Sequence, residues 1–234
     1  MTPRIRNLLR RTLTTHRLLD DGEQVLIAVS GGADSLCLLS LLVEYNRRQR
    51  KDWRILAVHV DPGFPGWKTA RLERIFRRLE VEYEIARTQV PVRQEACREN
   101  LCYVCARERR KRLFEIARSQ GIAKIALAHH LEDVNETYFL NLIYTASART
   151  FLPRQDLFSG GLQVIRPLYS FDRDMIVKYA KSANLRPVHN RCPGAQTGKR
   201  AVIRRFLNRL YREYPRIRNN IFAGIRNLKA EYLP

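Results

Sequence analysis

The sequence is poor in acidic residues, in cysteine and in long apolar runs. Its 23 Asp and Glu stand against 43 Lys and Arg, which leaves a formal net charge of +20. No apolar run approaches the ~18 residues that cross a bilayer, so we expect no membrane-spanning segment. The five cysteines and the lack of a secretory signal pattern favour a reducing compartment, the cytoplasm. Paired thiols there are more often metal ligands or catalysts than disulfides.

The large positive charge predicts a polyanionic partner, and nucleic acid is the first candidate. The alternative is a basic surface that serves only solubility. Clustering favours nucleic acid, because residues 198–234 contain ten Lys or Arg and two acidic residues.

The strongest local signal is residues 25–35, where an apolar β-prone run leads into Ser-Gly-Gly-Ala-Asp-Ser and then a Leu-rich segment. The run suits a strand buried on both faces, and the segment after it has helical length and spacing. Gly31 and Gly32 lack the Cβ atoms that keep backbone N–H groups from a ligand, and a helix start adds partial positive charge. We therefore predict a phosphate site at Ser30, Gly31, Gly32 and Ser35.

Asp34 stands inside this turn and would repel a bare anion, so its presence implies a Mg²⁺ ion between carboxylate and phosphate. The turn has neither the Gly-Lys-Ser/Thr of a Walker loop nor the third glycine of a dinucleotide-binding fingerprint. The alternative is a strand-to-helix connection without a ligand, in which Asp34 is only the N-cap.

Strand-like and helix-like segments alternate along most of the chain. Apolar strand patterns cover residues 53–60, 83–86, 123–128 and 164–168, and helical patterns cover 68–79, 102–118, 133–146 and 172–183. Loops are expected at residues 91–100, 151–162 and 187–198. This order predicts an α/β fold with a doubly wound parallel sheet, whose ligands lie at the carboxyl ends of the strands.

Basic helices are expected at both ends of the sheet-forming region. Residues 1–19 superficially resemble a transit peptide, but their leucines recur at helical spacing, so we expect a folded amphipathic helix. Two more basic helices are expected over residues 199–214 and 215–229. We place the domain boundaries at 1–20, 21–186 and 187–234. In the first C-terminal helix we expect one face to belong to the core, namely Val202, Phe206, Leu207, Leu210 and Tyr214. The arginines that lie largely off this face could meet phosphates, namely Arg204, Arg205, Arg209 and Arg212.

Polar residues follow two further strands. His59 and Asp61 end the second strand, where they would lie beside the adenine or ribose of a bound nucleotide; a purely structural role is the alternative. Residues 129–137 place two histidines and three carboxylates at a strand-to-helix junction. Asp133 is predicted to join Asp34 around Mg²⁺, because paired carboxylates neutralise pyrophosphate as it leaves. The alternative is a charged helix cap.

Cysteines form the last cluster. Cys102 and Cys105 make a C-x-x-C at a helix start, and Cys192 follows 87 positions after Cys105 (192 − 105). Structural zinc could use these three thiols with His189. Including Cys97 gives the nominal spacing of a plant-type 2Fe-2S site. We expect Cys37, in an apolar helix, to be a buried inert thiol.

Residues 30–35 resemble the pyrophosphate loop (PP-loop) of the ATP pyrophosphatases, which split ATP between the α and β phosphates and pass AMP to a substrate oxygen. With the three cysteines, the chain resembles the tRNA 2-thiolation enzymes, most closely the tRNA-cytidine(32) 2-sulfurtransferase family. The matching segments are residues 30–35, 59–65, 101–107, 128–133, 165–168 and 192–196. The segment 144–149 departs from that family by lacking its glycines, and the chain is shorter than many relatives at its ends.

This resemblance implies an adenine nucleotide alpha hydrolase-like fold, ATP, Mg²⁺ and a tRNA substrate. It also implies a 4Fe-4S cluster on Cys102, Cys105 and Cys192 with one iron open for sulfide. The C2 oxygen of a pyrimidine would be adenylylated and then replaced by sulfur from a cysteine desulfurase or free sulfide. A homodimer is implied as well. The alternatives are a tRNA lysidine synthetase-like ligase, which needs no thiols, and a zinc-bearing RNA-binding module with a degenerate nucleotide site.

Overall fold

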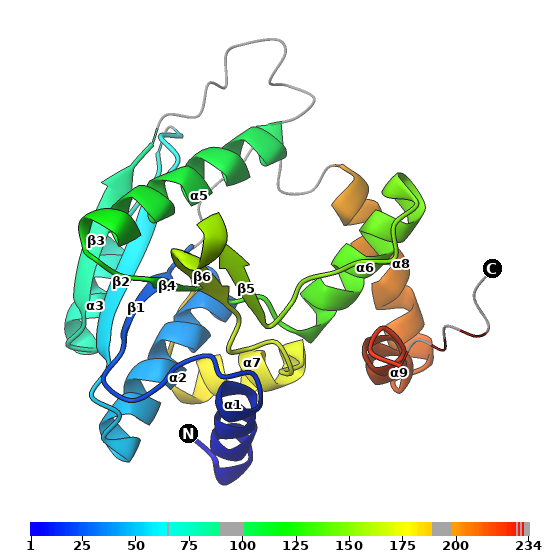
Figure 1. Cartoon of the computed structure of the whole chain (residues 1–234), viewed down its shortest axis with the longest axis horizontal. Helices are drawn as coiled ribbons and strands as arrows, with labels where there is room; N and C mark the ends of the chain where they lie inside the picture. Colours follow the sequence, from blue (N-terminus) through cyan, green and yellow to red (C-terminus); the bar gives the residue numbers. More distant parts are fainter. Residues whose placement is uncertain (65, 89–100, 189–197, 228, 230, 232–234) are drawn as a thin grey trace.

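The computed structural model describes the chain except for residues 65, 89–100, 189–197, 228, 230 and 232–234. Its centre is one six-stranded sheet in the order β3-β2-β1-β4-β6-β5 (Figure 1). Five strands are parallel, β1 (Gln24–Ala28), β2 (Arg54–Asp61), β3 (Glu82–Arg87), β4 (Lys124–Ala126) and β6 (Leu162–Ile165), and β5 (Arg154–Leu157) is antiparallel. The predicted fold class is confirmed. The carboxyl ends of the parallel strands meet at one edge, which is where the site lies.

Helices cover both faces of this sheet. A large apolar cluster joins one face to α1 (Pro3–Thr15), α2 (Ala33–Gln49), α3 (Ala70–Arg78) and α7 (Arg173–Ser182). A smaller cluster joins the other face to α5 (Leu101–Ser119). The central strands β1 and β2 read as nearly unbroken apolar runs because both of their faces are buried in this way. Residues 1–15 therefore include a folded helix, as predicted, whose Ile5, Leu9 and Leu13 are buried in the larger cluster.

Three helices form a lobe beside the sheet. α6 (Leu131–Thr145) packs against α8 (Lys199–Glu213) and α9 (Ile217–Gly224), as Figure 1 shows to the right of the strands. The last helix is shorter than the expected 215–229. No helix within the described residues is long and apolar enough to cross a bilayer.

The structure corrects two sequence-based expectations in the β5–β6 region. Residues 151–162 were expected to form a loop, but Arg154–Leu157 is an edge strand paired with β6. Its sequence shows no alternation of apolar and polar residues, because none of its residues is fully buried. The following strand runs over Leu162–Ile165 and not 164–168, since Pro167 has no N–H for a strand ladder.

The predicted core face of α8 is correct for Leu207 only. Ile203, Leu207 and Tyr211 are buried, whereas Phe206 is 48% and Tyr214 58% exposed. The buried residues recur every four positions and meet α6 and α9. The spacing of the apolar residues in the sequence also fits a neighbouring face of the helix, because apolar residues lie on both sides of it.

Candidate active site

The predicted phosphate loop connects β1 to α2. Ser35 Oγ donates to the Gly32 carbonyl at 3.0 Å, and Ser30 Oγ lies 3.2 Å from Ser35 Oγ. Gly32 is the N-cap residue, so α2 begins at Ala33 with its first N–H groups at the carboxyl edge of the strands. The loop thus brings Ser30, Gly31, Gly32 and Ser35 around one helix N-terminus, which is suited to phosphate oxygens.

Gly31 has a conformation that only glycine adopts easily. Its φ is +91°, and an added Cβ would lie 3.5 Å from Val188 Cβ and 3.6 Å from Leu72 Cδ2. The Gly31 carbonyl also accepts the Val188 N–H at 2.9 Å. The hydrogen bond from Val188 therefore holds the loop, and a side chain at position 31 would strain the backbone.

Gly31→Ala is expected to destabilise the protein by about 1–2 kcal/mol through left-handed backbone strain and to weaken ATP binding. Gly22→Ala is the matched control, because Gly22 has φ +76° but no atom within 4 Å of an added Cβ. Both variants should melt earlier, and only Gly31→Ala should lose ATP affinity in calorimetry. Equal ATP affinity in the two variants would contradict the assignment of the loop.

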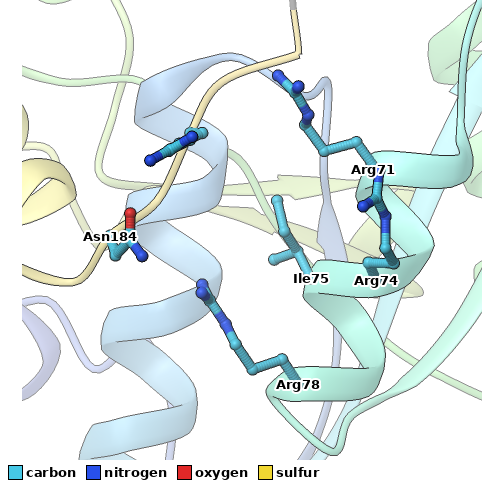
Figure 2. A pocket seen from close by; sticks show the side chains of 6 residues that line it. Arg71, Arg74, Ile75, Arg78 and Asn184 are labelled. Atoms are coloured by element: carbon cyan, nitrogen blue, oxygen red, sulfur yellow. The ribbon is translucent and has the colours of Figure 1, made fainter.

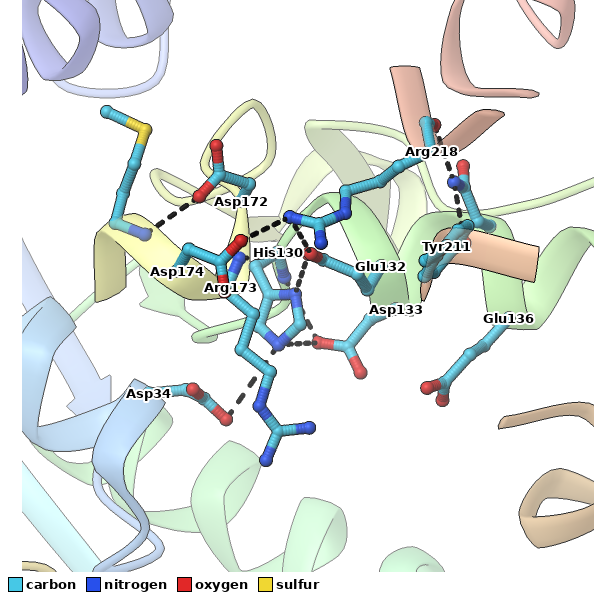
Figure 3. Close-up of polar contacts among 12 residues, drawn as sticks. Asp34, His130, Glu132, Asp133, Glu136, Asp172, Arg173, Asp174, Tyr211 and Arg218 are labelled. Carbon is cyan, nitrogen blue, oxygen red and sulfur yellow. Dashed lines mark hydrogen bonds and ion pairs between the residues drawn. The ribbon is translucent and has the colours of Figure 1, made fainter. Parts of the chain in front are cut away.

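Asp34 and Asp133 converge on one imidazole (Figure 3). They lie in the first turns of α2 and α6, which follow the adjacent strands β1 and β4. His130 Nε2 is 3.9 Å from Asp34 Oδ2 and 3.5 Å from Asp133 Oδ2. The His130 N–H also donates to Asp133 Oδ2 at 3.1 Å, so Asp133 caps its helix as well. The structure therefore brings together the two carboxylates that the sequence predicted as a pair.

The electrostatics of this cluster favour a cation between the carboxylates. Burial raises the pKa of Asp34, and the charge of Asp133 adds to that effect, while His130 opposes it. Burial alone would lower the pKa of His130, but its hydrogen bond to Glu132 and the charges of Asp133 and Asp34 outweigh burial and raise that pKa. The raised pKa of His130 reflects the negative carboxylates around it, and a cation placed between Asp34 and Asp133 would offset their mutual repulsion.

Asp34 and Asp133 are suited to Mg²⁺ that is bound together with nucleotide phosphates. Within the described ranges, no three or more His, Cys, Asp or Glu side chains are grouped to hold a metal ion. Mg²⁺ is typically bound by one or two carboxylates together with substrate phosphates and water, so it needs no such group. The donor set is therefore suited to an ion that binds together with a nucleotide.

Glu132 contacts the His130 ring nitrogen that faces away from Asp34 and Asp133. Its Oε2 lies 2.9 Å from His130 Nδ1, and its Oε1 is 3.1 Å from an Arg218 terminal nitrogen of α9 (Figure 3). The backbone N–H of Arg173, the first residue of α7, donates to the same carboxylate at 3.1 Å. Sequence analysis did not assign Glu132 or Arg218, because the partner of Glu132 lies 86 positions away (218 − 132).

His129 belongs to a different group. Its ring stacks on Phe151 with centroids 4.4 Å apart, and Arg166 Nε donates to His129 Nδ1 at 3.2 Å. Burial lowers the His129 pKa to about 4, so the ring is neutral at physiological pH. Arg166 also donates to the Leu152 carbonyl at 2.6 Å, which fixes the segment before β5.

The contacts of His59 match the structural role that was the alternative to a place beside the nucleotide. The side chain is fully buried, its Nδ1 lies 2.7 Å from the Val29 carbonyl, and its Nε2 accepts the Trp67 indole N–H at 2.9 Å. Burial lowers the His59 pKa, so the neutral ring is a structural link between β1 and β2. Asp61 is partly exposed, and its Oδ1 accepts the Gly63 N–H at 2.8 Å.

The predicted cluster ligands lie only partly within the described residues. Cys105 lies near the start of α5 and is partly buried. The Cys102 side chain, Cys192 and Cys97 are outside the described residues. Cys37 is buried in α2, as predicted, and burial raises the pKa of its thiol.

Polar contacts also join α6 to the C-terminal helices. Arg204 donates two hydrogen bonds to the buried Glu136 carboxylate, from Nε to Oε1 at 2.7 Å and from a terminal nitrogen to Oε2 at 2.9 Å. Asn135 Nδ2 donates to the Tyr211 hydroxyl at 3.0 Å. Arg204 is therefore engaged within the protein, which corrects its assignment to the phosphate-facing arginines, whereas Arg205 and other predicted members of that set are exposed.

Glu136→Gln is expected to lower the free energy of unfolding by about 1–3 kcal/mol, since it leaves a half-buried guanidinium without its counter-charge. Glu213→Gln, an exposed change on α8, should alter it by less than about 0.5 kcal/mol. Urea unfolding monitored by circular dichroism measures both. Equal unfolding midpoints in the two variants would show that the Arg204–Glu136 pair does not stabilise the packing of α8 on α6.

Comparison with known proteins shows the family. The model of the PP-loop domain family matches residues 2–211. The chain belongs to the PP-loop family. It is 30% identical to the tRNA-cytidine(32) 2-sulfurtransferase of Syntrophotalea carbinolica, over 98% of this chain and 91% of that protein. It is 32% identical to the protein of the same name from Dichelobacter nodosus, over 98% of this chain and 88% of that protein. The predicted resemblance is confirmed.

A solved PP-loop structure supports the same architecture. The U34-tRNA thiolase NcsA of Methanococcus maripaludis, determined with its 4Fe-4S cluster, superposes with a TM-score of 0.76. The two share 22% identity, and the match covers 98% of this chain and 80% of that one. This likeness supports the PP-loop fold, including the helices that follow the sheet.

Proposed function

We propose that this PP-loop protein is an ATP-dependent tRNA thiolase that replaces the C2 oxygen of cytidine 32 by sulfur. The observation that supports this most is the convergence of Asp34 and Asp133 beside a phosphate loop, in a chain 30–32% identical to tRNA-cytidine(32) 2-sulfurtransferases. The net charge of +20 fits a tRNA substrate.

In the first proposed step, the loop residues and the N–H groups at the start of α2 hold the phosphates of ATP. The C2 oxygen of the base attacks the α-phosphorus, the bond to the bridging oxygen breaks, and pyrophosphate leaves. Activation is needed because an unmodified carbonyl oxygen is a poor leaving group. Asp34 and Asp133 would hold Mg²⁺, which would supply positive charge for the departing pyrophosphate. Asp61 is proposed to lie near the ribose.

In the second proposed step, sulfide attacks C2, the carbon–oxygen bond breaks, and AMP leaves. Cys102, Cys105 and Cys192 are the proposed ligands that would hold a 4Fe-4S cluster, and this cluster would bind the sulfide. Thiol donors suit iron–sulfur and zinc centres equally, so the metal content of anaerobically purified protein distinguishes the two. Iron and acid-labile sulfide are expected; zinc without iron would contradict the cluster.

Three further proposals rest on the family resemblance. The protein works in the cytoplasm as a homodimer, and its sulfur comes from a cysteine desulfurase or from free sulfide. Whether Cys97 takes part is a further variable that a Cys97→Ala variant would resolve by its iron content.

The direct test of the first step is release of pyrophosphate from ATP by the purified protein with and without tRNA. We expect release that depends on tRNA and Mg²⁺. Release that instead requires free lysine would indicate the lysidine synthetase alternative. Tight tRNA binding without any pyrophosphate would indicate an RNA-binding module with a degenerate nucleotide site.

A further inference from the structure

Four arginines line a small pocket beside the phosphate loop. The pocket has a volume of about 270 Å³ and is lined by Arg71, Arg74, Ile75, Arg78, Asn184 and Arg186 (Figure 2). All four arginines are exposed, and no acidic side chain is among the lining residues. We call this pocket the arginine groove.

The arrangement follows from the geometry of α3. Arg71, Arg74 and Arg78 are three and four positions apart, which places them on one face of the helix. Figure 2 shows these three side chains extending from α3 around Ile75, with Asn184 across the pocket. The fourth arginine comes from the segment after α7.

The acidic side chains near the groove form ion pairs with arginines outside it. In the described part of the chain, Glu73 pairs with Arg77 at 3.5 Å, and Glu80 pairs with Arg47 at 2.9 Å. None of the four groove arginines forms an ion pair with a described carboxylate. Like charges gathered without counter-charges repel one another, so the groove favours an anion from outside the chain.

One end of the groove lies near the loop. A Cβ added at Gly31 would lie 3.6 Å from Leu72, the neighbour of Arg71, and the segment that contains Arg186 continues to Val188, whose N–H donates to the Gly31 carbonyl. From Arg71 to Arg78 the arginines extend over about 10 Å of helix. A row of this length suits successive phosphates along a chain better than one compact anion.

We propose that the arginine groove binds the phosphodiester backbone of the substrate RNA and guides it past the phosphate loop. The proposal rests on the proposed function in one respect, namely that RNA is the substrate. The groove binds phosphates without reading bases, so it adds affinity and orientation and no sequence preference. It lies on the α3 side of the sheet, apart from the basic C-terminal helices.

The test compares two doubly substituted proteins with equal changes of charge. Arg74→Gln/Arg78→Gln removes two groove cations, and Arg10→Gln/Arg11→Gln removes two exposed arginines of α1, outside the groove. Dissociation constants for tRNA are measured at several salt concentrations. The groove variant should bind more weakly, and its slope of log affinity against log salt should be smaller by about 1.5, the value for two lost phosphate contacts. The control slope should change by less than about 0.5.

A second titration uses inorganic pyrophosphate with the same proteins. Pyrophosphate should stabilise wild type and groove variant equally, because its site is the loop. Equal salt slopes in the groove and control variants would overturn the proposal. Loss of pyrophosphate affinity with unchanged tRNA affinity would also overturn it, by identifying a small-anion site. Melting temperatures check folding, and removing clustered like charges should not lower them.

The outcomes separate this proposal from the proposed function. If wild type releases pyrophosphate with tRNA and the groove variant keeps the full salt slope, only the groove proposal fails. If the groove variant loses salt dependence but wild type releases no pyrophosphate with tRNA, the groove stands and the proposed reaction fails.

Discussion

Asp34→Asn is expected to lower tRNA-dependent pyrophosphate release by about 100- to 1,000-fold, the usual effect of removing one group that stabilises charge in the transition state. The substitution keeps the size of the side chain but removes the charge that would hold Mg²⁺ beside the phosphates. The assay follows pyrophosphate from ATP under saturating tRNA. Asp133→Asn should have a similar effect, and the double variant should be little worse than either, because the two residues act as a unit.

Stability separates this role from a structural one. Burial raises the pKa of Asp34, so its carboxylate is less favourable in the folded protein than in the unfolded chain, and its charge contributes no folding stability at pH 7. Asp34→Asn should therefore melt no earlier than wild type at pH 7. Asp174→Asn is the matched control, since Asp174 is exposed and pairs with Arg218 at 3.1 Å on the outside of the cluster. Pyrophosphate release near the wild-type rate in Asp34→Asn would remove Asp34 from the mechanism.

Cys105→Ala is expected to abolish thiolation while pyrophosphate release stays within about threefold of wild type. Loss of a direct cluster ligand should cost at least about 100-fold, because even second-shell partners of metal sites are worth roughly 10- to 100-fold. Nucleoside mass spectrometry measures thiolation, and iron analysis measures the cluster. Cys192→Ala should behave in the same way and keep ATP binding.

The control for the cysteines is Cys37→Ala. Cys37 is 1% exposed in the core of α2, and burial raises the pKa of its thiol, so it is unreactive. This variant should keep its iron and its thiolation activity. Full thiolation in Cys105→Ala or in Cys192→Ala would exclude that residue as an essential ligand.

The sheet could be predicted because its strands are apolar on both faces. Val25–Ile27 and the β2 segment carry this pattern in a few consecutive residues, and each is followed by glycine, proline or a charged cluster. The polar edge strand Arg154–Leu157 has no such pattern, because it pairs with one neighbour only. The division of the chain at residues 20 and 187 stays a prediction.

The phosphate loop and the Asp34–Asp133 pair could be predicted because strand-to-helix junctions of a parallel sheet meet at one edge. Topology did not reveal that His59 turns inward, since its partner Trp67 belongs to the loop after β2. The contacts of Arg204 and Arg218 with α6 depend on how the C-terminal helices fold back, which no local pattern encodes. Sequence therefore located the candidate site residues better than the residues that hold them in place.

The central claim is that this chain adenylylates and then thiolates a cytidine in tRNA. The measurement is mass spectrometry of nucleosides from tRNA incubated with anaerobically purified protein, ATP, Mg²⁺ and sulfide, followed by mapping of the modified position. We expect 2-thiocytidine at position 32, none without ATP, and none with Asp34→Asn. Unmodified cytidine from a protein that contains iron and binds tRNA, or lysidine formed when lysine is added, would contradict the claim.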